Sequence, residues 1–292
     1  MMRVTHTGLL DLVNRATQSQ SARIRSLEEQ ATTGRSVNRP SDAPAMLGEI
    51  HRMEASVADQ GVFVANANSA VSVLQVTDDA LGSAANILAR AREIAVQMAS
   101  DTISPDERAL AAGEVDALKA AFLDVANTSF GGRYVFAGTA WDAPAYDDSG
   151  VYQGNSDSPV TQTGAASWIE TGRDGSAIFQ GDADAIAMFD DLSAALTAND
   201  ADGISASLDT IDTSLASINA ARSDVGFAVN HAEDSIGVAE GLSASFGARL
   251  EELTSADPAE TYMKLGELRN NFTATLQVAA SSSHMSLFDL MT

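Results

Sequence analysis

Residues 204–253 carry a seven-residue repeat that restricts this part of the chain to a helical architecture. Apolar side chains recur at alternating steps of four and three, and 13 of the 15 positions are apolar. Such spacing is typical of one long helix packed side by side with others. At about 1.5 Å per residue, ~50 residues span roughly 75 Å, so we predict a rod and not a globule with a pocket. The positions are Ile204, Leu208, Ile211, Leu215, Ile218, Arg222, Val225, Val229, Ala232, Ile236, Ala239, Ser243, Phe246, Leu250 and Leu253.

Two polar residues, Arg222 and Ser243, interrupt this apolar seam. Arg222 either specifies the register of the helices or extends its charged end to the edge of the rod. The second alternative is preferred here.

Helical periodicity predicts five further helices, at about residues 8–33, 44–100, 104–127, 182–198 and 258–283. For the second of these, Ser41 or Asp42 is the expected cap, with Pro44 in the first turn. Its two seven-residue repeats are expected to form one seam, at Ile50, Val57, Val64 and Val71 and at Leu74, Leu81, Leu88 and Ala95.

A small β-rich insertion is predicted between the helices that flank residues 131–181. Glycines bracket an expected short strand within 131–138, and further β-prone pieces follow at 150–154, 160–163, 167–171 and 177–180. The expected fold is therefore mainly α: an elongated rod of long antiparallel coiled-coil-like helices from both chain ends, with a small β-rich inserted domain. The expected divisions are an N-terminal assembly helix and loop (1–44), N-terminal rod helices (45–130), the insertion (131–181), C-terminal rod helices (182–254), and a C-terminal assembly helix and tail (255–292).

Composition excludes several classes of function. The formal net charge of −23 argues against nucleic-acid binding, which needs clustered Lys and Arg. The chain has no cysteine, its four histidines are scattered, and no nucleophile, base and electrophile occur together, so neither a metal, a cofactor nor an enzyme is expected. The sequence contains no run of 18 apolar residues, so membrane insertion is not expected. The start of the chain lacks a cleavable signal, which leaves either a cytoplasmic protein or export by another route.

The two ends of the chain differ in character from the middle. Residues 1–44 carry a balance of +2, whereas residues 141–203 carry −11. The stripe of the first helix is thin, with Gln20 at its centre, so this helix is not expected to be stable alone. We expect an acidic, solvent-exposed middle and near-neutral ends that are buried against partners.

Four motifs resemble those of the flagellin superfamily. They are EQATTGRSVNRPSDAP at 29–44, GRYVFAG at 132–138, YQGN at 152–155 and MSLFDL at 285–290. The two prolines in the first motif and the sequence of the tail are closer to the proteins at the junction of hook and filament than to filament subunits. Ala43 departs from the family, which commonly has Asp there.

This resemblance implies a structural junction protein of the bacterial flagellum, whose terminal helices order and pair only on assembly. It also implies export without a cleaved signal peptide to an extracellular place in the flagellum. The implied partners are sister copies in a ring, a neighbouring hook-associated protein, flagellin and a flagellar export chaperone.

The candidate interface combines both ends of the chain. We expect Leu9, Val13, Ile24 and Leu27 to pack in the assembly against Tyr262, Leu265, Phe272 and Leu276. The loop with Arg35, Arg39 and Pro40 is expected to contact acids of a neighbouring subunit. The apolar tail residues Met285, Leu287, Phe288 and Leu290 are expected to contact the export chaperone.

Each of these expectations has a simpler alternative. The terminal helices could dock on the rod as ordinary helices, the loop could be a solvated turn, and the tail a plain helix end. At the level of function, the alternatives are a flagellin subunit of the filament and, more distantly, a helical signalling rod.

Overall fold

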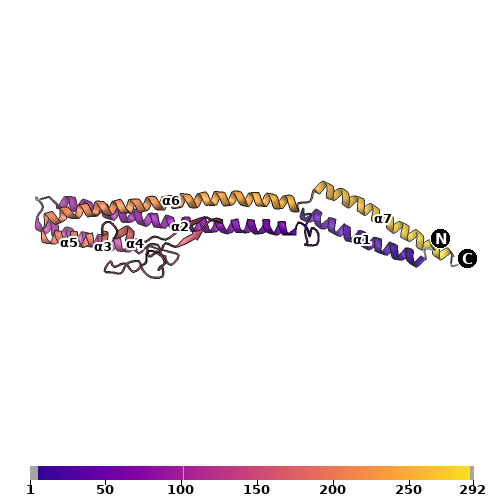
Figure 1. Cartoon of the computed structure of the whole chain (residues 1–292), viewed down its shortest axis with the longest axis horizontal. Coiled ribbons are helices and arrows are strands. Elements are labelled where there is room, and N and C mark those ends of the chain that lie inside the picture. The colour runs from indigo at the N-terminus through magenta and orange to yellow at the C-terminus, as the bar shows by residue number, and fades with distance from the viewer. Residues whose placement is uncertain (1–5, 101, 290–292) are drawn as a thin grey trace. The chain divides into compact units, whose positions relative to one another are not determined.

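The computed structural model describes the backbone of residues 6–100 and 102–289, and side chains from residue 11 to residue 280 except at 101. The helices are α1 (His6–Thr33), α2 (Leu47–Met98), α3 (Pro105–Ala126), α4 (Gly175–Phe179), α5 (Ala185–Ala198), α6 (Ala201–Thr254) and α7 (Pro258–Asp289). Two antiparallel two-stranded sheets pair β1 (Ser129–Phe130) with β2 (Arg133–Tyr134), and β3 (Val160–Gln162) with β4 (Trp168–Glu170). The expected mainly α fold with a small β-containing insertion is confirmed (Figure 1).

The chain forms two compact units. Unit 1 comprises residues 1–57 and 244–292, and unit 2 comprises residues 58–243. Unit 1 therefore holds α1 and α7 with the adjoining ends of α2 and α6. Unit 2 holds the remainder of these two long helices, α3 to α5 and both sheets.

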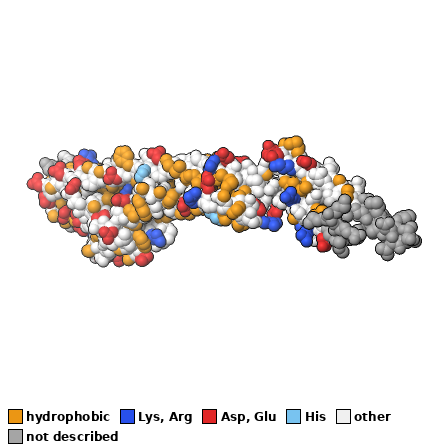
Figure 2. All heavy atoms as spheres, turned by 45° about the vertical axis from the view of Figure 1, so that its right-hand side comes forward, with side chains coloured by type: hydrophobic (Ala, Val, Ile, Leu, Met, Phe, Trp, Pro, Cys, Tyr) orange, Lys and Arg blue, Asp and Glu red, His pale blue; other side chains and the backbone are white. Residues whose placement is uncertain are grey.

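Acidic side chains dominate the surface of unit 2. Its sequence holds 28 acidic against seven basic residues, a net charge of −21. Red acidic side chains accordingly outnumber blue basic ones at the end of unit 2 that carries α3 and α5 (Figure 2). This part of the molecule favours solvent over contact with anionic partners.

The seven-residue seam organises the core of unit 2. Ile204, Ile211, Ile218, Val225 and Ala232 of α6 are all fully buried, at 0% exposure. On α2, the second predicted repeat (Leu74, Leu81, Leu88, Ala95) is also fully buried. The long helix expected at 204–253 is thereby confirmed, and it lies beside α2 in this unit (Figure 1).

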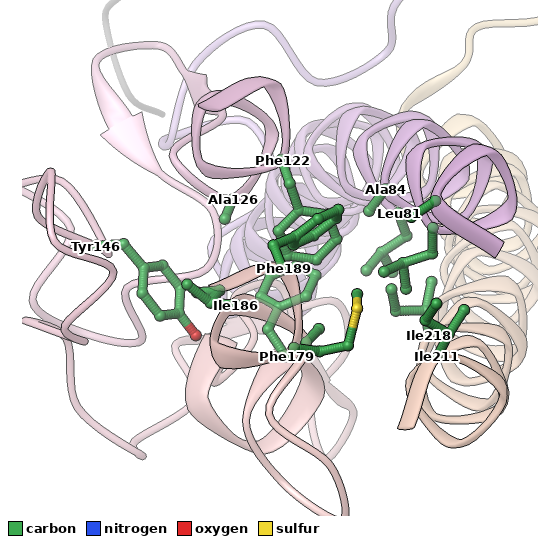
Figure 3. Close-up of a cluster of buried hydrophobic side chains, with 14 of the residues drawn as sticks. Leu81, Ala84, Phe122, Ala126, Tyr146, Phe179, Ile186, Phe189, Ile211 and Ile218 are labelled. Atoms are coloured by element: carbon green, nitrogen blue, oxygen red, sulfur yellow. The ribbon is translucent and has the colours of Figure 1, made fainter. Parts of the chain in front are cut away.

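An aromatic cluster closes the core where the insertion packs on the helices (Figure 3). The ring of Phe179 lies 5.4 Å from that of Phe122 and 5.1 Å from that of Phe136, both edge-on. The ring of Phe189 of α5 also lies 5.4 Å from that of Phe122. The insertion is thus joined to the helices through a fully buried core.

An ion pair bears on the two alternatives for Arg222. Its guanidinium donates to both carboxylate oxygens of Asp78 on α2, at 3.0 and 3.2 Å. This two-point contact joins α2 and α6, and the Arg222 side chain is 40% exposed, as the alternative of a charged end at the edge of the rod requires; whether it also specifies register stays a prediction.

Several local predictions were wrong. The helix expected from Pro44 begins at Leu47, because Asp42 accepts from the N–H groups of Asn38 and Arg39 and caps the loop, not the helix. Residues 177–179 of the β-prone piece at 177–180 belong to α4, and Gln180 is the C-cap of that helix. Asp174 caps its N-terminus by accepting from the N–H of Ser176. Residues 150–154 form only an isolated bridge between Tyr152 and Tyr146.

Two of the family-like motifs hold the insertion together. Gly138 has φ +64°, and a Cβ there would overlap the carbonyl oxygen of Asn155. The Tyr152 hydroxyl lies 3.0 Å from the carbonyl oxygens of Phe136 and Asn155. Burial raises the pKa of Tyr152 to about 12, so the hydroxyl keeps its proton and can donate. These motifs therefore serve packing.

We expect Gly138→Ala to lower the free energy of unfolding by about 2 kcal/mol or more, because alanine is strained at this φ and its methyl group has no space. Thermal unfolding followed by circular dichroism checks this. The matched control is Gly113→Ala in the exposed interior of α3, where a Cβ meets open space. It should raise stability by up to about 1 kcal/mol. Equal effects of the two substitutions would contradict the argument.

Candidate assembly interface

The site that the sequence singles out lies in unit 1, where α1 and α7 pack together (Figure 1). Contacts along the pair fix its direction. The amide of Gln20 lies 3.4 Å from the Thr275 hydroxyl, and further along Glu28 forms an ion pair with Arg269. As residue numbers rise on α1 they fall on α7, so the two ends of the chain run antiparallel.

Each helix presents one heptad-spaced face to the other. On α1 the half-buried face is Val13, Thr17, Gln20, Ile24, Leu27 and Ala31. On α7 it is Thr261, Leu265, Leu268, Phe272, Thr275 and Ala279. Both series step by four and three, the spacing of a coiled-coil seam. Leu265 is the most deeply buried apolar member, at 6% exposure.

The structure divides the predicted interface residues into two groups. Val13, Ile24, Leu27, Leu265 and Phe272 lie on the facing stripes of the pair. Tyr262 and Leu276 instead lie on the flank of α7, 60% and 46% exposed. Within one chain they do not contribute to the seam.

The flanks of the pair expose more apolar area than the sequence indicated. Leu12 on α1 and Met263 and Val278 on α7 are each more than 60% exposed. Sequence reasoning missed them because single apolar residues outside a stripe give no periodic signal. It also missed Leu268, which the heptad through Leu265 and Phe272 would have found.

A shallow groove runs along one side of the pair. Its volume is about 390 Å³; Leu27 and Leu268 contribute apolar walls, and Arg23 and Lys264 add positive charge. The groove is open to solvent.

The loop after α1 is bonded to the segment between α6 and α7. Gly34 follows the last residue of α1 and has φ +71°. The N–H of Ser36 donates to the Thr254 carbonyl at 2.7 Å, and that of Ala256 to the Gly34 carbonyl at 2.9 Å. These bonds set where α1 and α7 start beside each other.

Side chains in the loop are only partly available to a neighbour. Arg39 pairs with Glu29 of the same chain, at 3.0 Å. Arg35 and Pro40 are exposed. The expected contact of both arginines with a neighbouring subunit stays a prediction, and within this chain Arg39 already has a partner.

Some predicted residues lie outside the described parts. The backbone of Leu9, Met285, Leu287 and Phe288 is described as helical, but their side chains are not, and Leu290 lies outside altogether. Among the described residues, no group of three or more His, Asp or Glu side chains is placed to hold a metal ion. In the same part of the chain, no helix is long and apolar enough to cross a membrane.

Comparisons with known proteins identify related sequences and folds. Residues 9–140 match the family model of the bacterial flagellin N-terminal helical region. Flagellar hook-associated protein 3 of Escherichia coli is 29% identical over 153 residues, which are 52% of this chain and 48% of that protein. The resemblance to the flagellin superfamily is confirmed.

Solved structures share the fold. A putative flagellar hook-associated protein from Vibrio parahaemolyticus matches with a TM-score of 0.68 at 20% identity, over 73% of this chain and all of that one. The flagellar junction protein FlgL from Legionella pneumophila matches with a TM-score of 0.58 at 16% identity, over 70% of this chain and 99% of that one. The matched sequence spans about half the length of the curated hook-associated relatives.

The cap of the loop yields a pH-dependent prediction. The backbone N–H groups of Arg39 and Asn38 hold the pKa of Asp42 below its ordinary 3.8. A lowered folded-state pKa means that the stabilisation is present at neutral pH and is lost as pH falls through that pKa. We therefore expect the amides of Asn38 and Arg39 to lose protection from hydrogen exchange only in acid, below pH 3.8.

In Asp42→Ala, the same two amides should lose protection at neutral pH as well. Ser41→Ala is the control, since its hydroxyl lies 3.5 Å from the carboxylate and makes no such cap. Hydrogen exchange read by NMR measures both. Unchanged protection in Asp42→Ala would show that the carboxylate does not hold the loop.

Proposed function

We propose that this chain, which carries a flagellin-type N-terminal helical region, is a structural subunit of the bacterial flagellum that joins the hook side to the filament. The observation that carries the proposal is a set of exposed apolar side chains on the outer sides of the α1/α7 pair, at Leu12, Tyr262, Met263, Leu276 and Val278. Exposed apolar groups gathered on one helix pair favour association. The protein is proposed to act by subunit packing and not as an enzyme.

Assembly through unit 1 follows from simple energetics. A two-helix pair with half-buried seams gains little on its own, so it becomes stable when neighbours cover its flanks. In a closed ring the contact is heterologous, with one flank of a subunit against a different flank of the next. We include self-association of this chain in such a ring in the proposal.

The junction role is preferred over that of a filament subunit. Relatives matched over about half of this chain are named hook-associated protein 3, and a protein of the same fold is titled a junction protein. The alternative is a flagellin subunit of the filament. It is supported by the match of residues 9–140 to the model of the bacterial flagellin N-terminal helical region. Electron microscopy of a deletion strain separates them, because loss of a junction protein leaves filaments that form but are shed. Loss of a filament subunit leaves no filament.

The remaining partners are proposed on the same basis. They are a neighbouring hook-associated protein on one side, flagellin on the other, and an export chaperone that binds the tail at Met285, Leu287, Phe288 and Leu290 before assembly. The place of action is the flagellum outside the cell, reached without a cleaved signal peptide. Immunogold labelling of isolated hook–filament complexes tests the location directly.

We expect Tyr262→Ser with Leu276→Ser to leave the helical circular dichroism unchanged and to abolish filament attachment in a complemented deletion strain. Both side chains are exposed in the single chain, so their loss affects association more than folding. Phe227→Ser is the matched control: Phe227 is 72% exposed on α6 but lies in unit 2. Normal filament attachment in the double variant would show that Tyr262 and Leu276 are not part of the interface.

The loop gives an independent expectation. Arg35→Glu should reduce motility and filament attachment, because a reversed charge repels the acids of a neighbouring subunit. Arg39→Glu changes an in-chain pair as well, so it is combined with Glu29→Arg to restore that pair. If both variants attach filaments normally, the loop is a solvated turn.

A further inference from the structure

A small pocket in unit 2 lies where the insertion meets α2. Its volume is about 240 Å³, and its lining includes Ser69 and Val73 of α2, the β1–β2 hairpin, Trp141 and Pro159. Sites for whole small molecules are larger, at roughly 300–1,000 Å³. This pocket therefore has room for one large side chain and not for a bulky cofactor.

The β1–β2 hairpin brings an aromatic ring and a cation to the same side of the pocket. The two glycines between its strands have φ +59° and +80°, which allows a two-residue turn between antiparallel strands. Phe130 and Arg133 are direct cross-strand partners, so their side chains leave the hairpin on the same face, and both line the pocket. The Tyr134 N–H donates to the Trp141 carbonyl at 3.1 Å and thereby holds Trp141 beside β2.

Arg133 differs from the other six basic residues of unit 2. Five of those form an ion pair with a carboxylate of the same chain: Arg90, Arg92, Lys119, Arg173 and Arg222. Arg108 is buried, at 4% exposure, and donates to the carbonyls of Met98 and Ser100. Arg133 is exposed, and its guanidinium lies over the Trp141 ring at 4.7 Å. Within the described residues it has no carboxylate partner.

The charge of the pocket differs from that of the unit around it. Unit 2 holds 28 acidic residues, yet none of the described residues that line the pocket is Asp or Glu. A guanidinium that stacks on a ring uses its face, and the N–H groups at its edge can still bind a carboxylate at two points. The pocket thus combines space for an apolar side chain with a cation that can pair with a negative charge.

Apolar side chains are also exposed on the β3–β4 hairpin, whose base lines the pocket. Val160 and Trp168 lie on the same face of this hairpin and are 55% and 54% exposed. Phe130, in the pocket itself, is 40% exposed. Tryptophan, tyrosine and arginine are the residue types that most often carry the binding energy of protein–protein interfaces. This composition, spread over more than one ring, favours a protein partner over a free small anion.

We propose that the pocket is a docking site for a segment of another protein that presents one bulky apolar side chain beside a single Asp or Glu. The apolar side chain occupies the pocket, and the adjacent carboxylate pairs with Arg133. The net charge of −21 on unit 2 repels a long acidic segment, whereas one carboxylate in direct contact lies well within the screening length of about 8 Å. The same net charge disfavours a second copy of this chain as the occupant.

Fluorescence of Trp141 gives a direct test. The chain has two tryptophans, so Trp168→Phe leaves Trp141 as the sole reporter in the full chain. Four blocked peptides are titrated: Gly-Phe-Asp-Gly, Gly-Asp-Phe-Gly, and the same two with Asn in place of Asp. We expect a saturable change with the acidic peptides. The Asn peptides should bind about three- to tenfold more weakly, because they lose a charge-assisted contact at a partly exposed site.

Substitutions separate the two parts of the site. Arg133→Gln should lower the affinity of the acidic peptides to that of the Asn peptides and leave the Asn peptides unchanged, and Arg133→Lys should retain part of the difference. Ser69→Phe, which fills the pocket from an exposed position of α2, should abolish binding of all four. The matched control is Arg92→Gln, which removes the same charge from unit 2 outside the pocket and should change nothing. Circular dichroism checks that each variant is folded.

Three results would overturn the proposal. If Arg133 serves only to cover the Trp141 ring, the acidic and Asn peptides bind equally, and Arg133→Gln changes only the melting temperature. The second is the absence of any saturable change with the acidic peptides. The third is dimerisation of the full chain that Arg133→Gln abolishes, measured by sedimentation, because it assigns the pocket to a second copy. All these measurements use the isolated chain, so their outcome is independent of filament attachment.

Discussion

Antiparallel pairing of helices that lie far apart in the chain is the interaction on which both units depend. In unit 1 the pair is α1 with α7, and in unit 2 the seam of α6 packs beside α2 (Figure 1). Burial of one Leu or Ile side chain contributes about 1.5–3 kcal/mol, whereas a half-exposed ion pair contributes about 0–1 kcal/mol. The apolar seams therefore supply the stability. Ion pairs such as Arg92–Asp212 at 2.7 Å contribute little to it and act mainly to favour one register.

The seams could be predicted because their signal is local and periodic. Every seventh residue from Ile204 to Ala239 is buried, and the helix expected at about residues 104–127 is formed as α3, with Ser104 and Glu107 capping its start. The start of α2 could not be read in the same way. Asp42 is chemically equivalent as a cap for the loop or for the helix, and only the path of the loop decides which N–H groups it meets. The β-prone prediction for residues 177–180 was wrong for a related reason. Burial of Phe179 among aromatic rings outweighs the β-prone composition of this segment.

The pairing of the two end helices was predictable in its location and less so in its detail. Periodicity placed Leu265 and Phe272 on one stripe of α7, and both face α1. Tyr262 and Leu276 were assigned to the same stripe because they are apolar at nearby spacing, yet they lie one step around the helix, on its flank. One sequence cannot distinguish a residue that faces its own partner helix from one that faces another subunit, because both are apolar. The distinction comes from the three-dimensional pairing, and here it leaves an apolar flank next to a completed seam.

The charge distribution limits where copies of this chain can meet. Unit 1 holds 12 acidic and ten basic residues, whereas unit 2 holds 28 and seven. Association through unit 2 brings together surfaces of net charge −21, and their repulsion acts over a screening length of about 8 Å at physiological ionic strength. Contact through unit 1 opposes charges of only −2 each, and it covers exposed apolar side chains. Charge therefore favours unit 1 for self-association, whereas exposed large apolar side chains occur on both units and do not distinguish between them.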